Sequence, residues 1–419
     1  MSLRPSSFSL AEERKIVALL GAVQFVNVLD FMMVMPLGPD FAAGLGIATS
    51  KLGWIGGSYM AAASLSGIVG SFFLDRFDRK RALLWALAGL GVGTLLGGFA
   101  TGFASLLAAR IFAGLFGGPA SSLTFSLAAD VVPVERRGRA MSALMSAFAV
   151  ASVLGVPAGL ELARHGGWRS PFFGVGALAL AVWIGTLRRL PTMRDHLERA
   201  RSERPWAASR ALLARKEVWL AYGCMAAAMV AGFSMIPNMA TYLELNLGYP
   251  RESLGSLYLG GGLASFALMI AGGRLIDRVG AAVGLGASLV GGLATALLIA
   301  VTYFGFALEP TPLPILALFI GFMAAMGVRG VATTAVASRV PEPHERARFV
   351  SFMSVFQHAA SAFGAFLSAA ILVEGPGGRL LKMDRVAGIS IAFSVFIVVF
   401  MVPLELRMNR IERGRDDVA

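Results

Sequence analysis

The chain has 419 residues, of which 56% are apolar and only 15% are charged, and its formal net charge is +12. Soluble globular domains carry about 25% charged residues, so this composition excludes an ordinary soluble protein. A single cysteine, Cys224, excludes an internal disulfide framework. The four histidines are scattered along the chain, so no metal site is expected. Together these features indicate an integral membrane protein.

Twelve apolar stretches of about 20 residues, the length that crosses a bilayer as a helix, follow one another along the chain. Ahead of the first stretch, Ser9 and Glu12 form a capping-box pattern that predicts a helix start, and no secretory signal is expected there. We predict membrane-spanning helices at 16–38, 52–74, 82–101, 104–131, 140–163, 170–187, 217–243, 252–273, 280–304, 313–338, 349–373 and 386–406.

The distribution of Lys and Arg predicts how the chain is oriented, because these residues favour the cytoplasmic side of a membrane. With the amino terminus inside, seven of the 37 lie in outer loops and two, Arg110 and Arg329, lie within spans; the remaining 28 are cytoplasmic. We therefore predict a plasma-membrane protein of the bacterial inner-membrane type with both termini in the cytoplasm. The positive charge then reflects topology and attraction to anionic lipid, and no nucleic-acid partner is expected.

The longest polar segment, residues 191–216, divides the spans into two groups of six. We predict an amino-terminal six-helix bundle at 1–190, a basic cytoplasmic linker at 191–216 and a carboxyl-terminal six-helix bundle at 217–419. Within the linker, Trp206 to Leu213 fit either an amphipathic helix on the inner membrane surface or a solvated chain.

The two halves resemble each other in sequence. A shift of 202 residues places Asp75-Arg76 on Asp277-Arg278, and a shift of 208 places Met145-Ser146 on Met353-Ser354. Because six helices separate the copies, both halves have the same orientation. A pseudo-two-fold axis along the membrane normal is expected to relate them, with a substrate site between them near the midplane.

A charged motif follows the second span and returns after the eighth. The stretches from Ser71 to Arg81 and from Gly273 to Gly280 each resemble the signature G-x-L-x-D-[RK]-x-G-[RK]-[RK] of the major facilitator superfamily. The first copy has Ser71 and Asp78 in place of glycines, and the second lacks the trailing basic pair. The resemblance covers essentially the whole chain and implies an all-α integral membrane fold of twelve transmembrane helices in two bundles.

In this family the motif acts as a latch that ties the two halves together on the cytoplasmic side in the outward-facing state. An aspartate at a helix end can accept hydrogen bonds from the amino terminus of a neighbouring helix and pair with nearby arginines. The alternative is that the charges only hold the loop in the cytoplasm. The resemblance implies gating roles for Asp75, Arg76, Arg79, Asp277 and Arg278, with Arg136, Arg137 and Arg139 as candidate partners.

Two further spans carry patterns of the same family. Arg110-Ile-Phe-Ala-Gly114-Leu-Phe-Gly117 in the fourth span resembles its R-x-x-x-G-x-x-G pattern, and Gly155-Val-Pro157-Ala-Gly159 in the fifth resembles a degraded antiporter motif. With Leu29-Asp30-Phe31 in the first span, the chain is similar to the bacterial drug and sugar efflux permeases, the drug:proton antiporter branch. Pro157 is expected to kink its helix, for alternating access or for packing alone.

Asp30 is the one carboxylate in the sequence that lies deep in a predicted span. Gln24, Asn27 and Asp30 are spaced three apart and share a helix face, which indicates a polar cavity. An arginine within a span must face a cavity or a partner. In the resembling efflux branch, a first-span acid and a fourth-span arginine are associated with proton coupling. We therefore predict that Asp30 carries the proton and Arg110 modulates it; the alternative is a static buried ion pair.

Other polar residues within spans are candidates for contacts with substrate. Arg329 fits three interpretations: neutralising an anionic substrate, reaching Asp30 across the cavity, or extending toward the inner surface. His358 and its neighbour Gln357 fit binding of substrate or of a second proton, or a structural role. The predicted substrate-binding residues are Gln24, Asn27, Asn238, Arg329, Gln357 and His358.

The sequence carries no G-x-x-x-x-G-K-[ST] pattern and no catalytic or metal-ligand constellation, so neither an enzyme nor a cofactor is expected. The leading hypothesis is a monomeric secondary transporter that uses the proton gradient to export a small amphipathic drug-like or sugar-like solute. A lysophospholipid or other lipid-type transporter and a proton-coupled or passive importer are alternatives. A non-transporting sensor is a fourth class, which the lack of a signalling domain disfavours.

Overall fold

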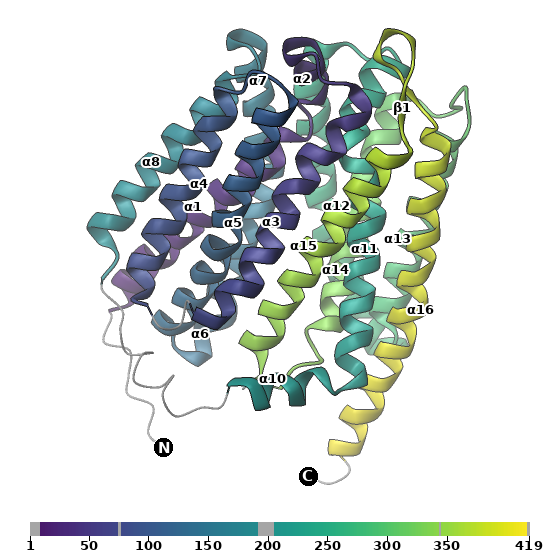
Figure 1. Cartoon of the computed structure of the whole chain (residues 1–419). Helices are drawn as coiled ribbons and strands as arrows, with labels where there is room; N and C mark the ends of the chain where they lie inside the picture. The colour runs from purple at the N-terminus through teal and green to yellow at the C-terminus, as the bar shows by residue number, and fades with distance from the viewer. Residues whose placement is uncertain (1–8, 74–76, 192–204, 343–344, 417–419) are drawn as a thin grey trace. The chain divides into compact units, whose positions relative to one another are not determined.

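The computed structural model describes residues 9–73, 77–191, 205–342 and 345–416. Within these ranges, twelve helices are long and apolar enough to cross a membrane, and Figure 1 labels them along the chain. The predicted all-helical membrane fold is therefore confirmed. The chain divides into two compact units, one of residues 1–47 and 58–203 and the other of residues 48–57 and 204–419.

In the first unit the helices pack through apolar and small side chains. The polypeptide of α6 continues through a π-helical turn, Ala151–Gly155, into α7, so these segments form one span. The helices are α1 (Leu10–Val34), the short α2 (Gly38–Leu45), α3 (Leu52–Phe73), α4 (Arg79–Gly98), α5 (Phe103–Val131), α6 (Val134–Val150), α7 (Val156–Gly166) and α8 (Ser170–Arg189). The start of α3, up to Gly57, belongs to the second unit.

The second unit has the same helical character and adds a two-stranded hairpin. In the hairpin, β1 pairs antiparallel with β2, and Val373 lies opposite Leu381. Its elements are α10 (Pro205–Leu213), α11 (Lys216–Thr241), α12 (Leu254–Val283), α13 (Gly286–Thr302), α14 (Ile315–Ala337), α15 (Arg346–Ile371), β1 (Val373–Glu374), β2 (Leu380–Leu381) and α16 (Met383–Asp416). The helix α10 lies where the sequence favoured either a surface helix or a solvated linker.

One helix boundary agrees with the sequence-based expectation and another differs from it. The capping box predicted at Ser9 and Glu12 is formed, since the Glu12 amide donates to the Ser9 hydroxyl and the Glu12 carboxylate accepts from the Ser9 amide, and α1 begins at Leu10, ahead of the apolar stretch predicted from residue 16. The second copy of the charged motif was expected in a loop after the eighth span. That expectation is wrong: α12 continues through Asp277 and ends at Val283, because Gly284 takes the left-handed conformation that terminates helices.

Small residues set the closest helix contacts. A side-chain carbon added to Gly93 of α4 would lie 2.7 Å from the backbone nitrogen of Ala113 on α5. One added to Gly364 of α15 would lie 2.7 Å from the carbonyl oxygen of Val230 on α11. In the second unit, the Trp54 ring at the start of α3 stacks on Phe366 of α15, with ring centroids 4.8 Å apart. Such contacts are how helices associate where lipid removes the hydrophobic driving force.

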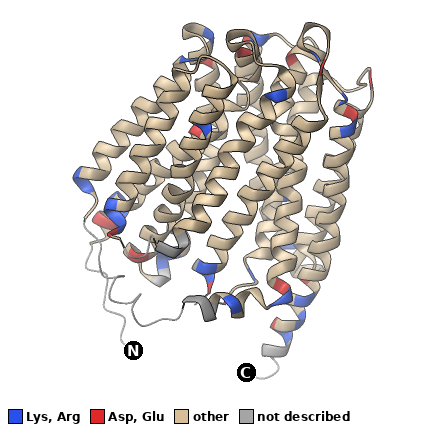
Figure 2. Ribbon diagram, viewed as in Figure 1, with Lys and Arg blue, Asp and Glu red and all other residues tan. Residues whose placement is uncertain are grey.

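Charged side chains gather mostly near the helix ends, as Figure 2 shows. This is the distribution expected of membrane-spanning helices, because a charge at bilayer depth is costly. The exceptions, charged residues buried within spans, are therefore the natural candidates for function. The orientation of the chain in the membrane stays a prediction.

Candidate functional site

Asp30 and Arg110 form a buried ion pair in the first unit. Nη1 of Arg110 lies 3.0 Å from Oδ1 of Asp30, and the two side chains are 1% and 0% exposed. The guanidinium also donates through Nη2 to the backbone carbonyl of Asp30 at 3.3 Å. The structure thus brings together the two residues that the sequence selected for proton coupling. Their roles in coupling stay predictions.

Thr94 of α4 is a third member of the site, and sequence reasoning missed it. Its hydroxyl lies 2.7 Å from Oδ1 of Asp30 and 2.8 Å from the carbonyl oxygen of Leu90. A hydroxyl has one hydrogen and can also accept, so it cannot donate to both oxygens at once. It can donate to a charged Asp30, or it can donate to Leu90 while accepting from a protonated Asp30. Thr94 therefore suits either protonation state of the carboxyl group.

Two polar atoms of the pair have no hydrogen-bond partner among the described residues. These are Oδ2 of Asp30 and Nε of Arg110, both fully buried. The guanidinium carbon of Arg110 lies 4.6 Å from the centroid of the Tyr59 ring, a cation–π contact. The positive charge is thus balanced by one carboxylate and one aromatic face, and the carboxylate retains an open oxygen where a proton can add.

Gln24 and Asn27, the other members of the polar face of α1, bond to neighbouring helices. The Tyr59 hydroxyl donates to Oδ1 of Asn27 at 2.8 Å, and Nδ2 of Asn27 donates to the carbonyl of Gly117 at 3.2 Å. Oε1 of Gln24 accepts from the Ser121 hydroxyl at 3.2 Å. The polar face therefore joins α1 to α3 and α5 around the ion pair. Contact with a substrate stays a prediction for both residues.

Arg329 is a second buried arginine, in the second unit. Its Nη2 donates to the carbonyl of Ala228 at 3.1 Å, and its Nη1 lies 3.4 Å from the Ser394 hydroxyl. Its Nε lacks a partner, and no carboxylate pairs with it within the described ranges. Among the described residues, the guanidinium hydrogen bonds go to a carbonyl and a hydroxyl, and the interpretation as an anion-binding residue stays a prediction.

The remaining predicted substrate contacts, Asn238, Gln357 and His358, lie apart on α11 and α15. Nδ2 of Asn238 donates to the Ser368 hydroxyl at 3.0 Å, so it joins these two helices. His358 is half-buried, with Nδ1 3.4 Å from the Ser354 hydroxyl one turn earlier. Gln357 is also half-buried, and its backbone carbonyl accepts from Ser361.

Asp75 and Arg76 of the predicted latch lie outside the described residues. Arg79 of α4 forms an ion pair with Asp130 of α5, and Arg136 of α6 pairs with the buried Glu13 of α1 at 2.8 Å. Sequence reasoning missed both carboxylates, although each lies near the end of its helix, as the two arginines do. These bonds hold the first unit together internally.

The charged motif also includes a helix cap, and three predicted latch residues are exposed. Asp78, which replaces a motif glycine, caps α4 by accepting from the amides of Lys80 and Arg81 at 2.9 and 3.3 Å. Arg139 is exposed on α6, and Asp277 and Arg278 are exposed on α12. A gating role for these residues stays a prediction.

Pro157 lies directly after the π-helical turn between α6 and α7. A proline has no amide hydrogen and cannot continue the α-helical ladder, so a change of helical geometry next to it is expected. The amide of Val156 bonds to the carbonyl of Ala151 five residues back, which is the π pattern. The helix is therefore widened just before Pro157, and a kink at this proline stays a prediction.

Comparison with known proteins identifies the family. A family model described as the Major Facilitator Superfamily matches residues 20–365 and, in a second match, residues 233–415. Since these matches cover most of the chain, the protein belongs to the major facilitator superfamily, a family of multi-pass membrane transporters.

Individual relatives share a quarter or so of the matched residues with this chain. The chain is 28% identical over 260 residues to a chloramphenicol resistance protein of Streptomyces lividans, and the matched region covers 61% of this chain and 65% of that protein. It is 24% identical over 261 residues to an uncharacterized MFS-type transporter of Bacillus subtilis (strain 168), covering 62% and 66%. The matches thus span slightly less than two thirds of these relatives.

Solved structures share the fold over almost the whole chain. A D-xylose–proton symporter superposes with a TM-score of 0.72 at 18% identity, covering 94% of this chain and 97% of that one. A bacterial homologue of the human lysosomal transporter Spinster, in an inward-facing conformation, has a TM-score of 0.70 at 17% identity, covering 96% and 98%. At these identities the likeness shows the fold alone.

Proposed function

We propose that the protein is a secondary active transporter that exports a small amphipathic, drug-like or sugar-like solute in exchange for protons. Transport of small solutes follows from the family. The proposal of proton coupling rests on one observation, the buried ion pair of Asp30 and Arg110 with Thr94 bonded to the same carboxylate oxygen.

The geometry suggests how Asp30 would load and release a proton. Charged Asp30 accepts from Arg110 and Thr94 through Oδ1, while Oδ2 is open. A proton added to the carboxyl group removes the charge that holds Arg110, because a buried arginine gains most from a charged partner. The Thr94 hydroxyl can continue to donate to Oδ1, because the added proton lies on Oδ2. Loss of the proton restores the pair, so each protonation state has its own set of bonds.

Export is supported by the similarity to a chloramphenicol resistance protein, because a membrane transporter that moves a drug out of the cell would give resistance to that drug. The cycle would use alternating access, with the substrate held by some of the polar residues Gln24, Asn27, Asn238, Arg329, Gln357 and His358. We further propose that it works as a monomer in the bacterial inner membrane, with both termini in the cytoplasm and without a bound cofactor.

Transport in proteoliposomes tests this proposal. Purified protein is reconstituted with a pH-sensitive dye inside, and amphenicols, lipophilic cations, sugars and lysophospholipids are added in turn. We expect at least one amphenicol or lipophilic cation to move protons in the direction opposite to its own. Asp384→Asn, a change at an exposed residue on α16, should transport like the wild type. Movement of substrate and protons in the same direction would favour an importer, and transport of lysophospholipids alone would favour the lipid alternative.

A further inference from the structure

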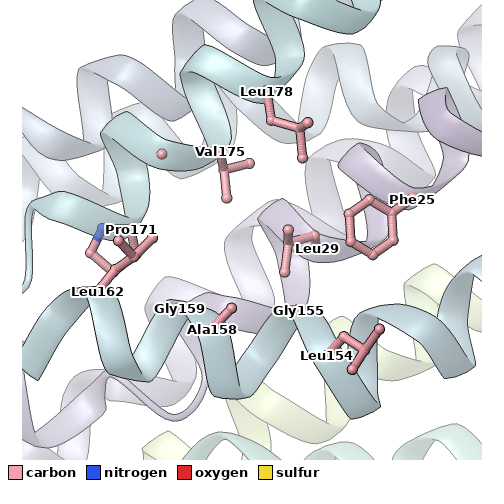
Figure 3. Close-up of a pocket in the computed structure, with 11 residues that line it drawn as sticks. Phe25, Leu29, Leu154, Gly155, Ala158, Gly159, Leu162, Pro171, Val175 and Leu178 are labelled. Atoms are coloured by element: carbon pink, nitrogen blue, oxygen red, sulfur yellow. The ribbon is translucent and has the colours of Figure 1, made fainter.

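A groove with a volume of about 410 Å³ lies in the first unit, between α1, α7 and α8. Its size is within the roughly 300–1,000 Å³ typical of ligand sites. Figure 3 shows Leu162 and Pro171 together at one end of the groove, with Leu29 of α1 facing it. The groove differs from the site of the buried ion pair because all of its lining residues are apolar.

The sequence explains why a hollow forms here. Gly155 ends the π-helical turn, Ala158 and Gly159 follow on α7, and Gly174 lies on α8, so small residues contribute to both walls of the groove. The π-helical turn that ends at Gly155 widens the helix at the same level. Larger residues, Leu154 and Leu162, form the edges and are 60% and 47% exposed.

The location of the groove within the membrane indicates that its occupant is a hydrocarbon chain. Every lining residue belongs to a membrane-spanning segment, namely 10–34, 136–166 or 170–189. Water would find no hydrogen-bond partners on these apolar walls, and a site needs such partners to hold ordered water. At bilayer depth the most abundant molecule with the matching surface is a lipid acyl chain.

The end of the groove near Leu162 and Pro171 leads to a charged rim. Glu161, Arg164 and His165 lie in the last turns of α7, where Arg164 pairs with Glu161. Arg169 lies two residues before Pro171, and its guanidinium carbon is 4.2 Å from the centroid of the Trp168 ring. Two arginines against one carboxylate give the rim a net positive charge. A tryptophan at such a level is typical of the membrane interface.

We propose that this groove binds one acyl chain of an anionic phospholipid, whose headgroup lies at the rim beside Arg164 and Arg169. The apolar walls account for the chain, and the excess positive charge accounts for the headgroup, since basic residues at the interface attract anionic lipids. Neither Asp30 nor Arg110 lines the groove.

Native mass spectrometry of the purified full chain tests the proposal, with phosphatidylglycerol and phosphatidylcholine as probes. The wild type should retain one phosphatidylglycerol molecule in preference to phosphatidylcholine. Ala158→Leu fills the groove and should weaken retention of the lipid, because the larger side chain takes the place of the acyl chain and removes its van der Waals contacts with the walls. Ala177→Leu makes the same change at an exposed position of α8 outside the groove and should retain lipid like the wild type.

The headgroup is tested separately with Arg164→Gln and Arg169→Gln combined, which should remove the preference for phosphatidylglycerol while a lipid is still bound. If Ala158→Leu is not recovered folded, Leu162→Trp fills the groove from its exposed edge. Equal retention by the groove-filling and the Ala177→Leu variants would mean that lipid binds only as a general annulus. That result, or a wild type that retains no lipid, overturns the proposal.

Discussion

At the scale of single residues, the ion pair of Asp30 and Arg110 is both costly and informative. Two ions of this kind lose their hydration when buried, and only good geometry with further hydrogen bonds offsets that loss. Here the bonds from Thr94 and from Nη2 of Arg110 supply part of the offset, yet one atom on each side has no partner in the described part of the chain. A purely structural pair would be expected to satisfy these atoms.

Removing one partner of the pair should cost more than removing both. Arg110→Gln leaves a buried aspartate without its counter-ion, which costs about 3–5 kcal/mol in comparable pairs. The double variant Asp30→Asn with Arg110→Gln has no buried charge and should recover part of the loss. Thermal unfolding in detergent measures both variants. If the double variant unfolds at a temperature lower than the wild type by the full sum of the Asp30→Asn and Arg110→Gln effects, the two residues are not coupled.

Thr94 should matter for coupling and not only for stability. Thr94→Val keeps the shape and removes the hydroxyl, which leaves Asp30 without one bond worth about 1.5–3 kcal/mol to a charged group. We expect reduced proton movement per substrate in proteoliposomes, with Thr94→Ser close to the wild type. Thr124→Val is the matched control, since Thr124 is equally buried and its hydroxyl bonds to the carbonyl of Ala120 on its own helix. Equal losses in both Val variants would remove Thr94 from the mechanism.

The residues of this site differ in how far the sequence could predict them. Asp30 and Arg110 stand out because a charge within a span needs a reason. Thr94 could not be selected, since a threonine in an apolar helix commonly bonds its own preceding turn and carries no sign of a tertiary partner. Glu13 and Asp130 were missed because their pairing depends on how α1 and α5 lie beside α6 and α4, which no spacing along the chain reveals.

At the scale of helices, α4 and α13 occupy corresponding places in the two halves. At the start of each, a carboxylate accepts hydrogen bonds from the first backbone amides. Asp78 caps α4 in the first unit. In the second unit α13 begins after Leu285, which has no capping side chain, and Glu405 of α16 accepts from the amides of Ala287 and Ser288 at 3.2 and 2.7 Å. A negative charge there stabilises the positive end of the helix dipole. A buried carboxylate from a distant helix thus replaces the local cap.

Glu405→Ala should therefore destabilise the second unit by at least the roughly 0.5–2 kcal/mol of a lost helix cap. Glu405→Gln keeps an acceptor oxygen and should lose less. Glu412→Ala on the same helix is the control, because its pair with Arg339 is exposed and such pairs contribute about 0–1 kcal/mol. Thermal unfolding checks the order of the three variants. A Glu405→Ala protein as stable as the Glu412→Ala protein would show that the cap contributes nothing measurable.

The sequence was enough to predict that each membrane-spanning helix exists, but it predicted only some of the residues at which the helices begin and end. All twelve spans are apolar for long enough to be recognised. The end of α12 was misplaced because Asp277 and Arg278 resemble a loop in composition, whereas the first residue that stops the helix is Gly284. Two further π-helical turns, Tyr242–Asn246 after α11 and Tyr303–Ala307 after α13, had no recognisable pattern in the sequence.

At the scale of the whole molecule, the sequence predicted the family and the twelve-helix fold because both are carried by periodic, redundant features. The apolar spans, the asymmetry of Lys and Arg and the two copies of the charged motif each point to the same architecture. Substrate recognition depends instead on a few side chains without a repeated pattern. This is why Arg329, Asn238 and His358 could be named as candidates but not assigned a ligand.

The account as a whole depends on Asp30 being the group that exchanges protons with the two sides of the membrane. The most direct measurement compares wild type and Asp30→Asn in proteoliposomes loaded with a transported substrate, recording substrate exchange and collapse of an imposed pH gradient together. The account predicts that the variant still exchanges substrate across the membrane but no longer couples it to protons. If the variant collapses the gradient with substrate as the wild type does, Asp30 is a structural residue and the proposed mechanism is wrong.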